Sequence, residues 1–324
     1  RVEMSRLPSL TDIAAYRIIK DHVADLEPEI LHGHGAKGGA FARLCSGRNG
    51  PKAIYTPHGG SLHYSATSPV GAAFLGLERL LKRRTSGFVF VAEFERDAYR
   101  AKVGPVTCPQ TIVHNGVADH ELVPVALRPD AADFVFMGEL RELKGVDMVI
   151  KGLAELNTKR LATAVIAGTG ALEQNLRTLA QTYGIEDQIK FVGLQPARKA
   201  FAMGRVLILP SRAESFPYAV LEGMGAAKPI ITTNVGGIPE MFGEQASSLL
   251  PPDDAAAVSA AMEQAMTDGA ALVSQAETLH ARAGKLFSLD RMVQGVCEFY
   301  SAILQEKPHP APSSLGASRA ENSA

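Results

Sequence analysis

Apolar positions along the chain come in short continuous runs, separated by longer stretches with helical spacing. Up to Val113 these runs end in Gly, Pro or His. Strands that are buried on both faces read as continuous apolar runs, so the alternation predicts parallel strands joined by helices. The predicted strands of this part are Glu29–His32, Lys52–Tyr55, Phe88–Val91 and Thr111–Val113.

The same pattern returns more clearly after Asp133. Between the first two apolar runs, Val146, Val149 and Leu153 belong to the stripe of an amphipathic helix. Alternating strands and helices of this kind indicate a parallel sheet with a doubly wound α/β topology. The predicted strands are Phe134–Met137, Ala164–Ala167, Lys190–Val192, Val206–Leu209 and Ile230–Thr232.

A length of 324 residues favours two domains, and the stretch from His120 to Ala132, with Pro124 and Pro129, resembles a linker. Few large apolar residues follow Lys307, so we expect the tail to be disordered. The expected parts are a Rossmann-like N-terminal domain (1–125), a second domain (126–288), a C-terminal helix (289–306) and the tail (307–324).

Composition narrows the class of protein. The chain is 46% hydrophobic and 21% charged, which is the composition of a globular protein. Its net charge of -1 provides no overall positive electrostatic field that would attract nucleic acid. Three cysteines without a CxxC pair suggest neither a disulfide framework nor a structural zinc site. No apolar run approaches the ~18 residues of a membrane span, so we expect a cytoplasmic protein.

The most informative stretch is PSRAESFPYAVLE, which follows the predicted strand that ends at Leu209. A loop carries Glu214, and a helix is expected to begin near Pro217, where its free N–H groups would attract phosphate. Glu214 and Glu222 could each accept hydrogen bonds from the hydroxyls of a nucleotide sugar. The alternative is that both are solvated side chains on a helix.

A second stretch, GELRELKG, places Arg141 and Lys144 at the carboxyl edge of the same sheet. Both cations could neutralise a diphosphate leaving group without a metal, or they could be ordinary charges at the start of a helix. The glycines at strand ends permit close approach of a base or ribose, although a tight strand-to-helix turn explains them equally well. They are Gly138, Gly168, Gly170 and Gly193.

Histidines follow two strands of the first domain, in LHGHGAKGG and YTPHGG. The pair His32 and His34 could bind zinc, but no further set of His and Asp ligands follows on later strands, so we expect no metal. His58 is expected to bond a sugar hydroxyl, with a structural turn as the alternative. His34 and Lys37 are expected on the acceptor side of a cleft.

The stretch LERLLKRR combines leucines with the cations Arg79, Lys82, Arg83 and Arg84. This mixture suits a helix that lies on a membrane surface. It also suits a solvated helix whose leucines face the core, and the sequence leaves both interpretations open.

Taken together and in this order, the motifs resemble the family 4 retaining glycosyltransferases, also called glycosyl transferases group 1. The motifs are HGHGAKGG, YTPHGG, VHNGV, GELRELKGVD, AGTGALEQNL, FVG, PSRAESFPYAVLE and GGIPE, within residues 29–305. The resemblance implies the GT-B fold, in which two Rossmann-like, doubly wound domains face each other across a cleft. The first-domain motifs are similar to those of enzymes that build bacterial exopolysaccharide, capsule or lipopolysaccharide.

The resemblance also implies roles for individual residues. Glu214 would contact the transferred sugar near the reaction centre, and Glu222 would contact the ribose. Lys144 matches the lysine that binds the diphosphate, and His58 matches a histidine that contacts the donor hexose. The backbone that would surround sugar and phosphates belongs to Ser215, Phe216, Pro217 and Tyr218.

Two departures from the family pattern matter. The family commonly has Arg where this chain has Glu139, and Arg141 would have to replace it. Family members also open with a strand and a Gly-rich loop, whereas this chain begins at Arg1 in a region that follows them. We therefore expect an N-terminally truncated first domain.

The implied reaction moves a sugar from a UDP- or GDP-sugar to a growing polysaccharide or a polyprenyl-linked glycan. It would retain the anomeric configuration, need no metal or other cofactor, and take place in the cytoplasm at the inner face of the membrane. Two alternatives are an epimerase of the same architecture and a non-catalytic subunit that binds a nucleotide sugar. A dehydrogenase fits least, because no GxGxxG follows Gly168.

Overall fold

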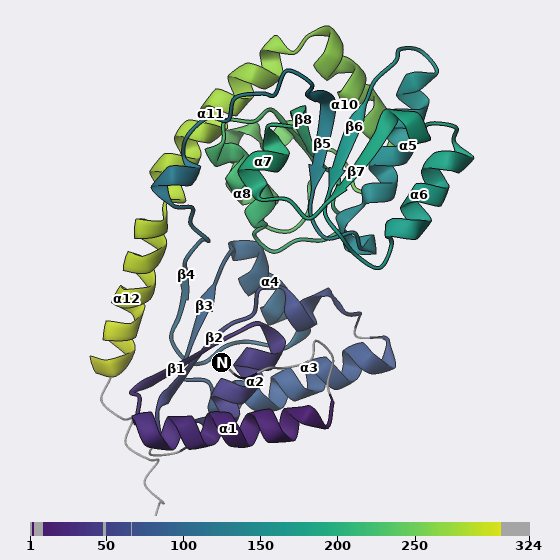
Figure 1. The fold of residues 1–324 in the computed structure, drawn as a ribbon. Helices are drawn as coiled ribbons and strands as arrows, with labels where there is room; N and C mark the ends of the chain where they lie inside the picture. Colours follow the sequence, from purple (N-terminus) through teal and green to yellow (C-terminus); the bar gives the residue numbers. More distant parts are fainter. Residues whose placement is uncertain (1, 3–8, 48–49, 66, 306–324) are drawn as a thin grey trace, which may run out of the picture.

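The computed structural model describes residues 2, 9–47, 50–65 and 67–305, so the tail expected to be disordered lies outside them. Two parallel sheets, each flanked by helices, form two lobes that lie one above the other (Figure 1). None of the described helices is both long and apolar enough to span a bilayer.

The first lobe contains a four-stranded parallel sheet in the order β1-β2-β3-β4, and all four predicted strands are confirmed to within two residues. The sheet is wound in one direction over its described length. Its strands are β1 (Ile30–His34), β2 (Lys52–Thr56), β3 (Gly87–Phe90) and β4 (Gln110–Ile112). Its helices are α1 (Thr11–Leu26), α2 (Gly35–Cys45), η1 (Gly60–His63), α3 (Pro69–Leu81), η2 (Lys82–Arg84), α4 (Glu93–Lys102) and η3 (Asp119–Glu121).

The second lobe contains a five-stranded parallel sheet in the order β7-β6-β5-β8-β9, and its five predicted strands are also confirmed. The chain reverses its direction of winding between β5 and β8, which is where open α/β sheets bind ligands. The strands are β5 (Ala132–Met137), β6 (Ala164–Ala167), β7 (Ile189–Gly193), β8 (Gly204–Leu209) and β9 (Ile230–Thr232).

Helices cover both faces of this second sheet, as Figure 1 shows. Between them they bury a core that includes Phe134, Phe136 and Leu207. The helices of this lobe are η4 (Glu142–Lys144), α5 (Val146–Asn157), α6 (Glu173–Thr182), η5 (Glu186–Gln188), α7 (Ala197–Phe201), α8 (Tyr218–Gly225), α9 (Ile238–Phe242), η6 (Gly243–Ser248), α10 (Ala255–Thr267) and α11 (Ala270–Leu286), and α12 (Leu289–Gln305) follows them.

The last helix, α12, leaves the second lobe and runs along the first (Figure 1). Its residues Phe299 and Ile303 pack against Ile54 and Val89 of the first sheet. The hydroxyl of Tyr300 lies 2.6 Å from Nδ1 of His32. The C-terminal helix therefore completes the core of the first lobe and reaches the carboxyl end of β1.

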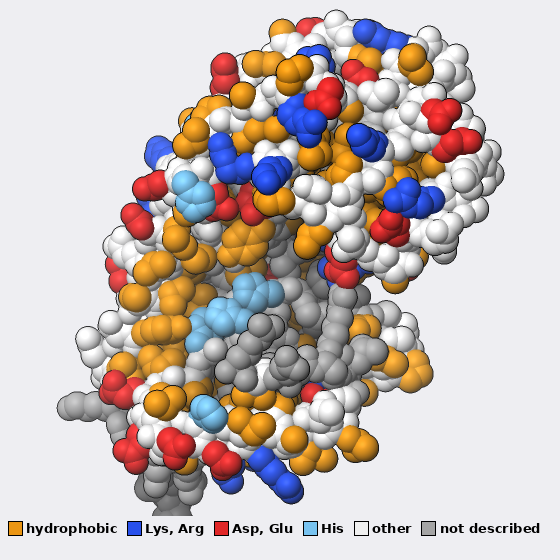
Figure 2. Space-filling view, in the orientation of Figure 1, with side chains coloured by type: hydrophobic (Ala, Val, Ile, Leu, Met, Phe, Trp, Pro, Cys, Tyr) orange, Lys and Arg blue, Asp and Glu red, His pale blue; other side chains and the backbone are white. Residues whose placement is uncertain are grey.

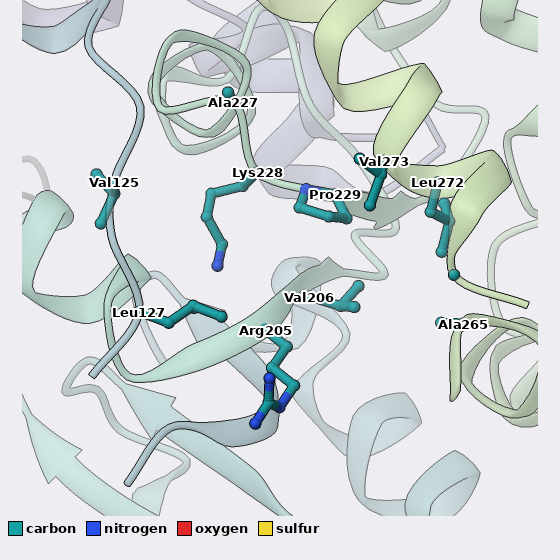
Figure 3. Close-up of a pocket in the computed structure, with 11 residues that line it drawn as sticks. Val125, Leu127, Arg205, Val206, Ala227, Lys228, Pro229, Ala265, Leu272 and Val273 are labelled. Atoms are coloured by element: carbon teal, nitrogen blue, oxygen red, sulfur yellow. The ribbon is translucent and has the colours of Figure 1, made fainter. Parts of the chain in front are cut away.

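A hollow lies at the amino ends of β8 and β9, on the edge opposite to the one where the predicted site residues follow their strands (Figure 3). Its walls are mostly apolar, and Lys228 and Arg205 are its cations. Nζ of Lys228 donates a hydrogen bond to the carbonyl of Gly204. Burial, and then the charge of Arg205, lower the pKa of Lys228 to about 8. Lys228 thus joins β9 to β8 in a dry environment.

A buried ion pair holds α2 and α3 together beneath the first sheet. Arg43 Nη1 and Nη2 donate to Glu78 at 2.8 and 3.2 Å, and Tyr55 donates its hydroxyl to the same carboxylate at 3.0 Å. The guanidinium also lies 4.0 Å from the Tyr55 ring centre. Because Arg43 is fully buried and Glu78 nearly so, each charge depends on the other for compensation.

Removing one partner of this pair should therefore destabilise the first lobe. We expect Glu78→Gln to lower the free energy of unfolding by about 3 kcal/mol or more, because it leaves the Arg43 guanidinium buried without a counter-charge. Urea unfolding followed by circular dichroism measures the change, with the exposed Glu29→Gln as control. A loss no larger than that of the control would show that the pair contributes nothing.

Candidate donor-binding and active site

The carboxyl ends of two neighbouring strands carry the central residues of the site. Val135 of β5 pairs with Leu207 of β8, so the loops after these strands start side by side. The first loop leads into η4 and ends in Lys144, and the second carries Glu214. Nζ of Lys144 lies 2.6 Å from Oε1 of Glu214.

A glycine allows these two loops to touch. Gly145, directly after Lys144, has a φ of 63°, in the left-handed region. A Cβ at this position would lie 2.0 Å from the carbonyl oxygen of Pro210. Only glycine can therefore turn the chain here and keep the lysine close to the Glu214 loop.

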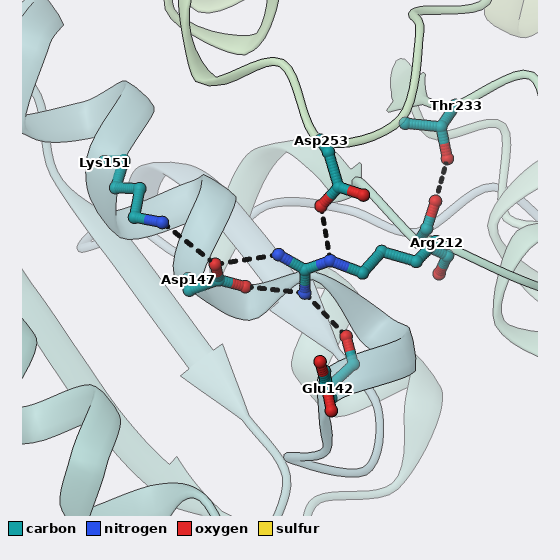
Figure 4. Close-up of polar contacts among 7 residues, drawn as sticks. Glu142, Asp147, Lys151, Arg212, Thr233 and Asp253 are labelled. Carbon is teal, nitrogen blue, oxygen red and sulfur yellow. Dashed lines mark hydrogen bonds and ion pairs between the residues drawn. The ribbon is translucent and has the colours of Figure 1, made fainter.

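Arg212 fixes the same two loops from the other side (Figure 4). Nη1 and Nη2 of its guanidinium donate to Oδ1 and Oδ2 of Asp147, each at 2.8 Å. Nη1 also donates to the carbonyl of Glu142 at 2.6 Å. Nε of Arg212 donates to Asp253. Such planar pairs hold geometry well, so Arg212 fixes the position of Lys144 relative to Glu214.

The charges in this network favour ionised partners. Burial alone would raise the pKa of Asp147, but hydrogen bonds from Arg212 and Lys151 outweigh it and lower the pKa below its usual value. The sequence pattern does not mark Arg212 as a site residue. The spacing of 65 positions from Asp147 gives no local pattern, and PSRAES indicates only that an arginine precedes Glu214.

Glu214 is less open to the cleft than the sequence suggests. Its side chain is 11% exposed and Lys144 is 19% exposed. Ser211 Oγ donates a second hydrogen bond to Glu214 at 2.7 Å. A group suited to sugar hydroxyls and a group suited to phosphate thus neutralise each other, and a ligand that carries both functions could separate them.

The backbone after Glu214 offers free donors. Helix α8 begins at Tyr218, and Pro217 is its N-cap, one residue before the helix proper. Among the described residues, no group accepts a hydrogen bond from the N–H of Ser215 or Phe216. The carbonyl of Phe216 is occupied by the side chain of Asn115 at 2.8 Å. The loop therefore has unpaired amides at a helix N-terminus, which favours anions.

Glu222, one turn into α8, lines a hollow beside this loop. Other lining residues are Gly138, Glu139, Gly168 and Thr169, which follow β5 and β6. Burial raises the pKa of Glu222 to about 7, and the negative charge of Glu121 adds to the shift. A carboxylate in this position could accept hydrogen bonds from the hydroxyls of a ligand.

The strand-end glycines have a packing role that the structure makes explicit. A Cβ at Gly168 would lie 1.8 Å from the carbonyl oxygen of Gly138, and one at Gly170 would lie 2.3 Å from that of Leu140. The close approach is therefore between the loop after β6 and the loop after β5. Gly138 and Gly168 still face the hollow, whereas Gly193 receives the N–H of Gly168 at 2.8 Å.

Arg141 lies beside the residue that departs from the family pattern. Its Nε is 3.4 Å from Oε2 of Glu139, and the two side chains are 37% and 41% exposed. This Nε makes no hydrogen bond among the described residues. Arg141 is thus held next to the hollow by an ion pair and keeps donor capacity.

Three histidines gather at the carboxyl edge of the first sheet, and Figure 2 shows histidine side chains where the lobes meet. The rings of His32 and His34 are 4.2 Å apart, and Nδ1 of His34 lies 2.9 Å from Nε2 of His58. Burial, followed by the neighbouring histidines, lowers the pKa of His32 to about 3 and that of His58 to about 4. Burial also lowers the pKa of His34.

These histidines are consequently neutral at pH 7, and the His34–His58 pair shares a single hydrogen between the facing nitrogens. In either tautomer, Nε2 of His34 and Nδ1 of His58 then carry opposite patterns, one an N–H and the other a lone pair. His58 also has a φ of 52°, a strained conformation for a residue with a side chain. Strain of this kind collects at functional sites.

The other cations named from the sequence have identifiable surroundings. Lys37 forms an ion pair with Asp12 of α1, with 2.7 Å between Nζ and Oδ1. Arg79 and Lys82 donate to the carbonyls of Lys102 and Pro105. Arg83 and Arg84 are exposed. Within the described ranges, no group of three or more His, Cys, Asp or Glu side chains is arranged to hold a metal ion.

Comparisons with known proteins identify the family of the chain. Residues 121–283 match the family Glycosyl transferases group 1, and residues 1–116 match the Glycosyl transferase 4-like domain. EpsD of Bacillus subtilis (strain 168), named as a glycosyltransferase, is 27% identical over 315 residues, which cover 90% of this chain and 81% of EpsD. WcaL of Escherichia coli (strain K12), named as a colanic acid biosynthesis glycosyltransferase, is 29% identical over 53% of this chain and 47% of its own length.

The fold has solved counterparts as well. The crystal structure of HepE from Anabaena in complex with UDP-glucose superposes with a TM-score of 0.79 and covers 91% of this chain and 84% of HepE, at 16% identity. The two lobes are those of the GT-B fold, and the family match extends over half of the chain. The chain belongs to the glycosyl transferases group 1 and is a glycosyltransferase (EC 2.4) with the GT-B fold.

Proposed function

We propose that the chain transfers a sugar from a nucleoside diphosphate sugar, a UDP- or GDP-sugar, to a growing polysaccharide or lipid-linked glycan, with retention at the anomeric carbon. The observation that carries this proposal is the Lys144–Glu214 pair beside the free amides of Ser215 and Phe216. Phosphate oxygens suit the lysine and the amides, and sugar hydroxyls suit the carboxylate. One ligand joins both functions.

The same groups account for the chemistry. As the bond to the anomeric carbon breaks, negative charge grows on the departing diphosphate. Lys144 and the α8 N-terminus would stabilise that charge without a metal, and Arg141 would add a further cation. Glu214 would hold the transferred sugar through its hydroxyls, and the leaving phosphate could take the proton of the acceptor hydroxyl.

The hollow around Glu222 fits the nucleoside. Its carboxylate would accept hydrogen bonds from ribose hydroxyls, and Gly138 and Gly168 line the space that the base would occupy. HepE was crystallised with UDP-glucose, which makes UDP the first nucleotide to test. WcaL, named for colanic acid biosynthesis, supports a polysaccharide acceptor.

Across the cleft, His58 would contact the donor sugar. The His34–His58 pair can offer one donor and one acceptor, which matches the dual character of sugar hydroxyls. His34, at the end of β1, and Lys37, in the first turn of α2, would face the acceptor. These assignments place each proposed contact on a strand end or helix start.

The pairing of Glu214 with Lys144 generates a specific prediction. We expect Glu214→Ala to reduce sugar transfer about 10²- to 10³-fold, because the sugar loses its anchor next to the reacting carbon. Affinity for UDP, measured by calorimetry, should stay equal or rise, since Lys144 is released from its partner. Transfer is measured as nucleotide release from a panel of UDP- and GDP-sugars with glycan acceptors.

The matched control for this variant is Glu263→Ala, which breaks a similar but exposed pair with Lys159. It should leave both transfer and UDP binding unchanged. Near-normal transfer by Glu214→Ala would contradict the proposed role. Interconversion of the sugar without transfer to any acceptor would instead indicate an epimerase.

Glu222 predicts a pH dependence of donor binding. The ionised carboxylate is the better acceptor for ribose hydroxyls, so binding improves as pH rises through about 7. We expect UDP to bind about tenfold more weakly at pH 6 than at pH 8. In Glu222→Gln this slope should disappear, apart from the titration of UDP itself, which is common to both proteins. An unchanged slope in the variant would assign the pH dependence to another group.

We also propose peripheral contact with the inner face of the cytoplasmic membrane through α3 and η2. Leu77 and Leu80 are 45% and 65% exposed, next to the exposed Arg83 and Arg84. Leu80→Glu should weaken co-sedimentation with phosphatidylglycerol vesicles about tenfold. Leu161→Glu, at a 72% exposed leucine of the other lobe, is the control. Equal sedimentation of both variants would exclude contact through α3.

A further inference from the structure

A buried carboxylate at the junction of the two lobes has no role in the proposed chemistry. Glu95 lies in the first turn of α4 and is 0% exposed. Burial raises the pKa of its carboxyl group, and hydrogen bonds from Val91, Gly59 and Ser215 act in the opposite direction. Such a group is expensive to bury, so its hydrogen-bond partners matter.

The partners of Glu95 come from both lobes. Oε1 accepts the N–H of Gly59 at 2.6 Å and the hydroxyl of Ser215 at 3.1 Å, while Oε2 accepts the N–H of Val91 at 3.1 Å. Gly59 directly follows His58, and Ser215 directly follows Glu214. One oxygen atom therefore joins the loop of the first-lobe histidine to the loop of the second-lobe glutamate.

The geometry requires a carboxylate at this position. Both oxygens face backbone N–H donors, so a side chain with only one acceptor oxygen would turn an NH₂ group toward an N–H. Hydrogen bonds to an ionised acceptor are also about twice as strong as neutral ones. Glutamine, although nearly the same shape, cannot reproduce the contacts of Glu95.

A second carboxylate holds the same helix in place. Glu240 of α9, in the second lobe, accepts the N–H groups of Glu93 and Phe94 at 2.8 Å each. These are first-turn amides of α4 that have no partner inside the helix. The start of α4 is thus attached to the second lobe by Glu240 and, through Glu95, to Ser215.

We propose that Glu95 is a positioning residue that fixes the His58 loop relative to the Glu214 loop, and so sets the closed geometry of the cleft. The role rests on the proposed function, because it concerns the two residues that would hold the transferred sugar from opposite sides. A displacement of about 1 Å between such groups is enough to cost about 10² in rate.

The test compares Glu95→Gln with Ser215→Ala. Ser215→Ala removes only the hydrogen bond from the Ser215 hydroxyl to Glu95. It keeps the backbone amide of residue 215 and leaves the bonds of Glu95 to Gly59 and Val91. We expect Glu95→Gln to lower kcat about 10²-fold and Ser215→Ala to lower it at least fivefold, with KM for the donor changed less than threefold. The double variant should be no slower than Glu95→Gln, because both changes break the same contact, the one between Glu95 and Ser215. UDP-glucose, UDP-N-acetylglucosamine and GDP-mannose are offered separately as donors.

The control is Asp97→Asn, the same chemical change at an exposed carboxylate of α4, which should leave kcat unaltered. If Glu95→Gln does not fold, Ser215→Ala decides the question by itself. Wild-type kcat in Ser215→Ala, or effects that multiply in the double variant, would overturn the proposal. A loss that appears wholly in KM would assign Glu95 to donor binding instead and would also overturn it.

Hydrogen exchange separates this inference from the proposed function. Peptides that cover residues 56–60 and 211–218 should both exchange faster in Ser215→Ala than in the unaltered chain, whichever sugar the enzyme uses. Faster exchange in a chain that transfers none of the sugars would contradict the proposed function but retain Glu95 as the link between the loops. Unchanged exchange in both peptides would exclude that link.

Discussion

The two-point contact between Arg212 and Asp147 is the constraint on which the candidate site depends. The pairing of β5 with β8 brings two loops to one edge of the sheet, but backbone pairing ends with the strands. Beyond that edge, the guanidinium ties the start of α5 to the loop after β8, and its additional bond to the carbonyl of Glu142 fixes the turn that carries Lys144. A planar donor group with five N–H bonds can satisfy these directions at once, which a lysine could not do.

In the site that Arg212 supports, a ligand would change how the charged side chains neutralise one another. Lys144 and Glu214 neutralise each other, whereas burial and the charge of Glu121 raise the pKa of Glu222 to about 7. The site therefore contains one ion pair, one partly buried carboxylate, and amides at the start of α8 that no described group accepts. A ligand with phosphates and several hydroxyl groups complements all three features, whereas a simple anion complements only the first and the last. Binding energy and selectivity for a nucleotide sugar would thus arise from the same few groups.

The sequence predicts the strands well because most are short, continuous apolar runs followed by Gly, Pro or His, as in Ala164–Ala167 and Val206–Leu209. It also predicts which residues follow those strands, so Lys144, Glu214 and His58 could be assigned to sheet edges before any geometry was known. The contacts between side chains could not be predicted. Asp147 lies 65 positions from Arg212, and the sequence pattern gives Glu95 only as one more charge at a helix start, although the structure buries it completely. The Arg212–Asp147 pair depends on how two loops of the second lobe pack, and the burial of Glu95 depends on how the two lobes meet. Neither periodicity nor composition encodes such contacts.

Contacts between the lobes involve the loop that would hold the sugar and the start of α4. Asn115 donates to the carbonyl of Phe216, Glu95 accepts the hydroxyl of Ser215, and Glu240 returns from the second lobe to α4. Each bond ends on a backbone group or a short side chain, so little rotamer freedom remains to absorb a shift of one lobe. The shape of the donor loop is consequently linked to closure of the cleft. An enzyme that must keep water away from a reactive sugar benefits from this link, because the loop adopts its full set of contacts only when the lobes are together.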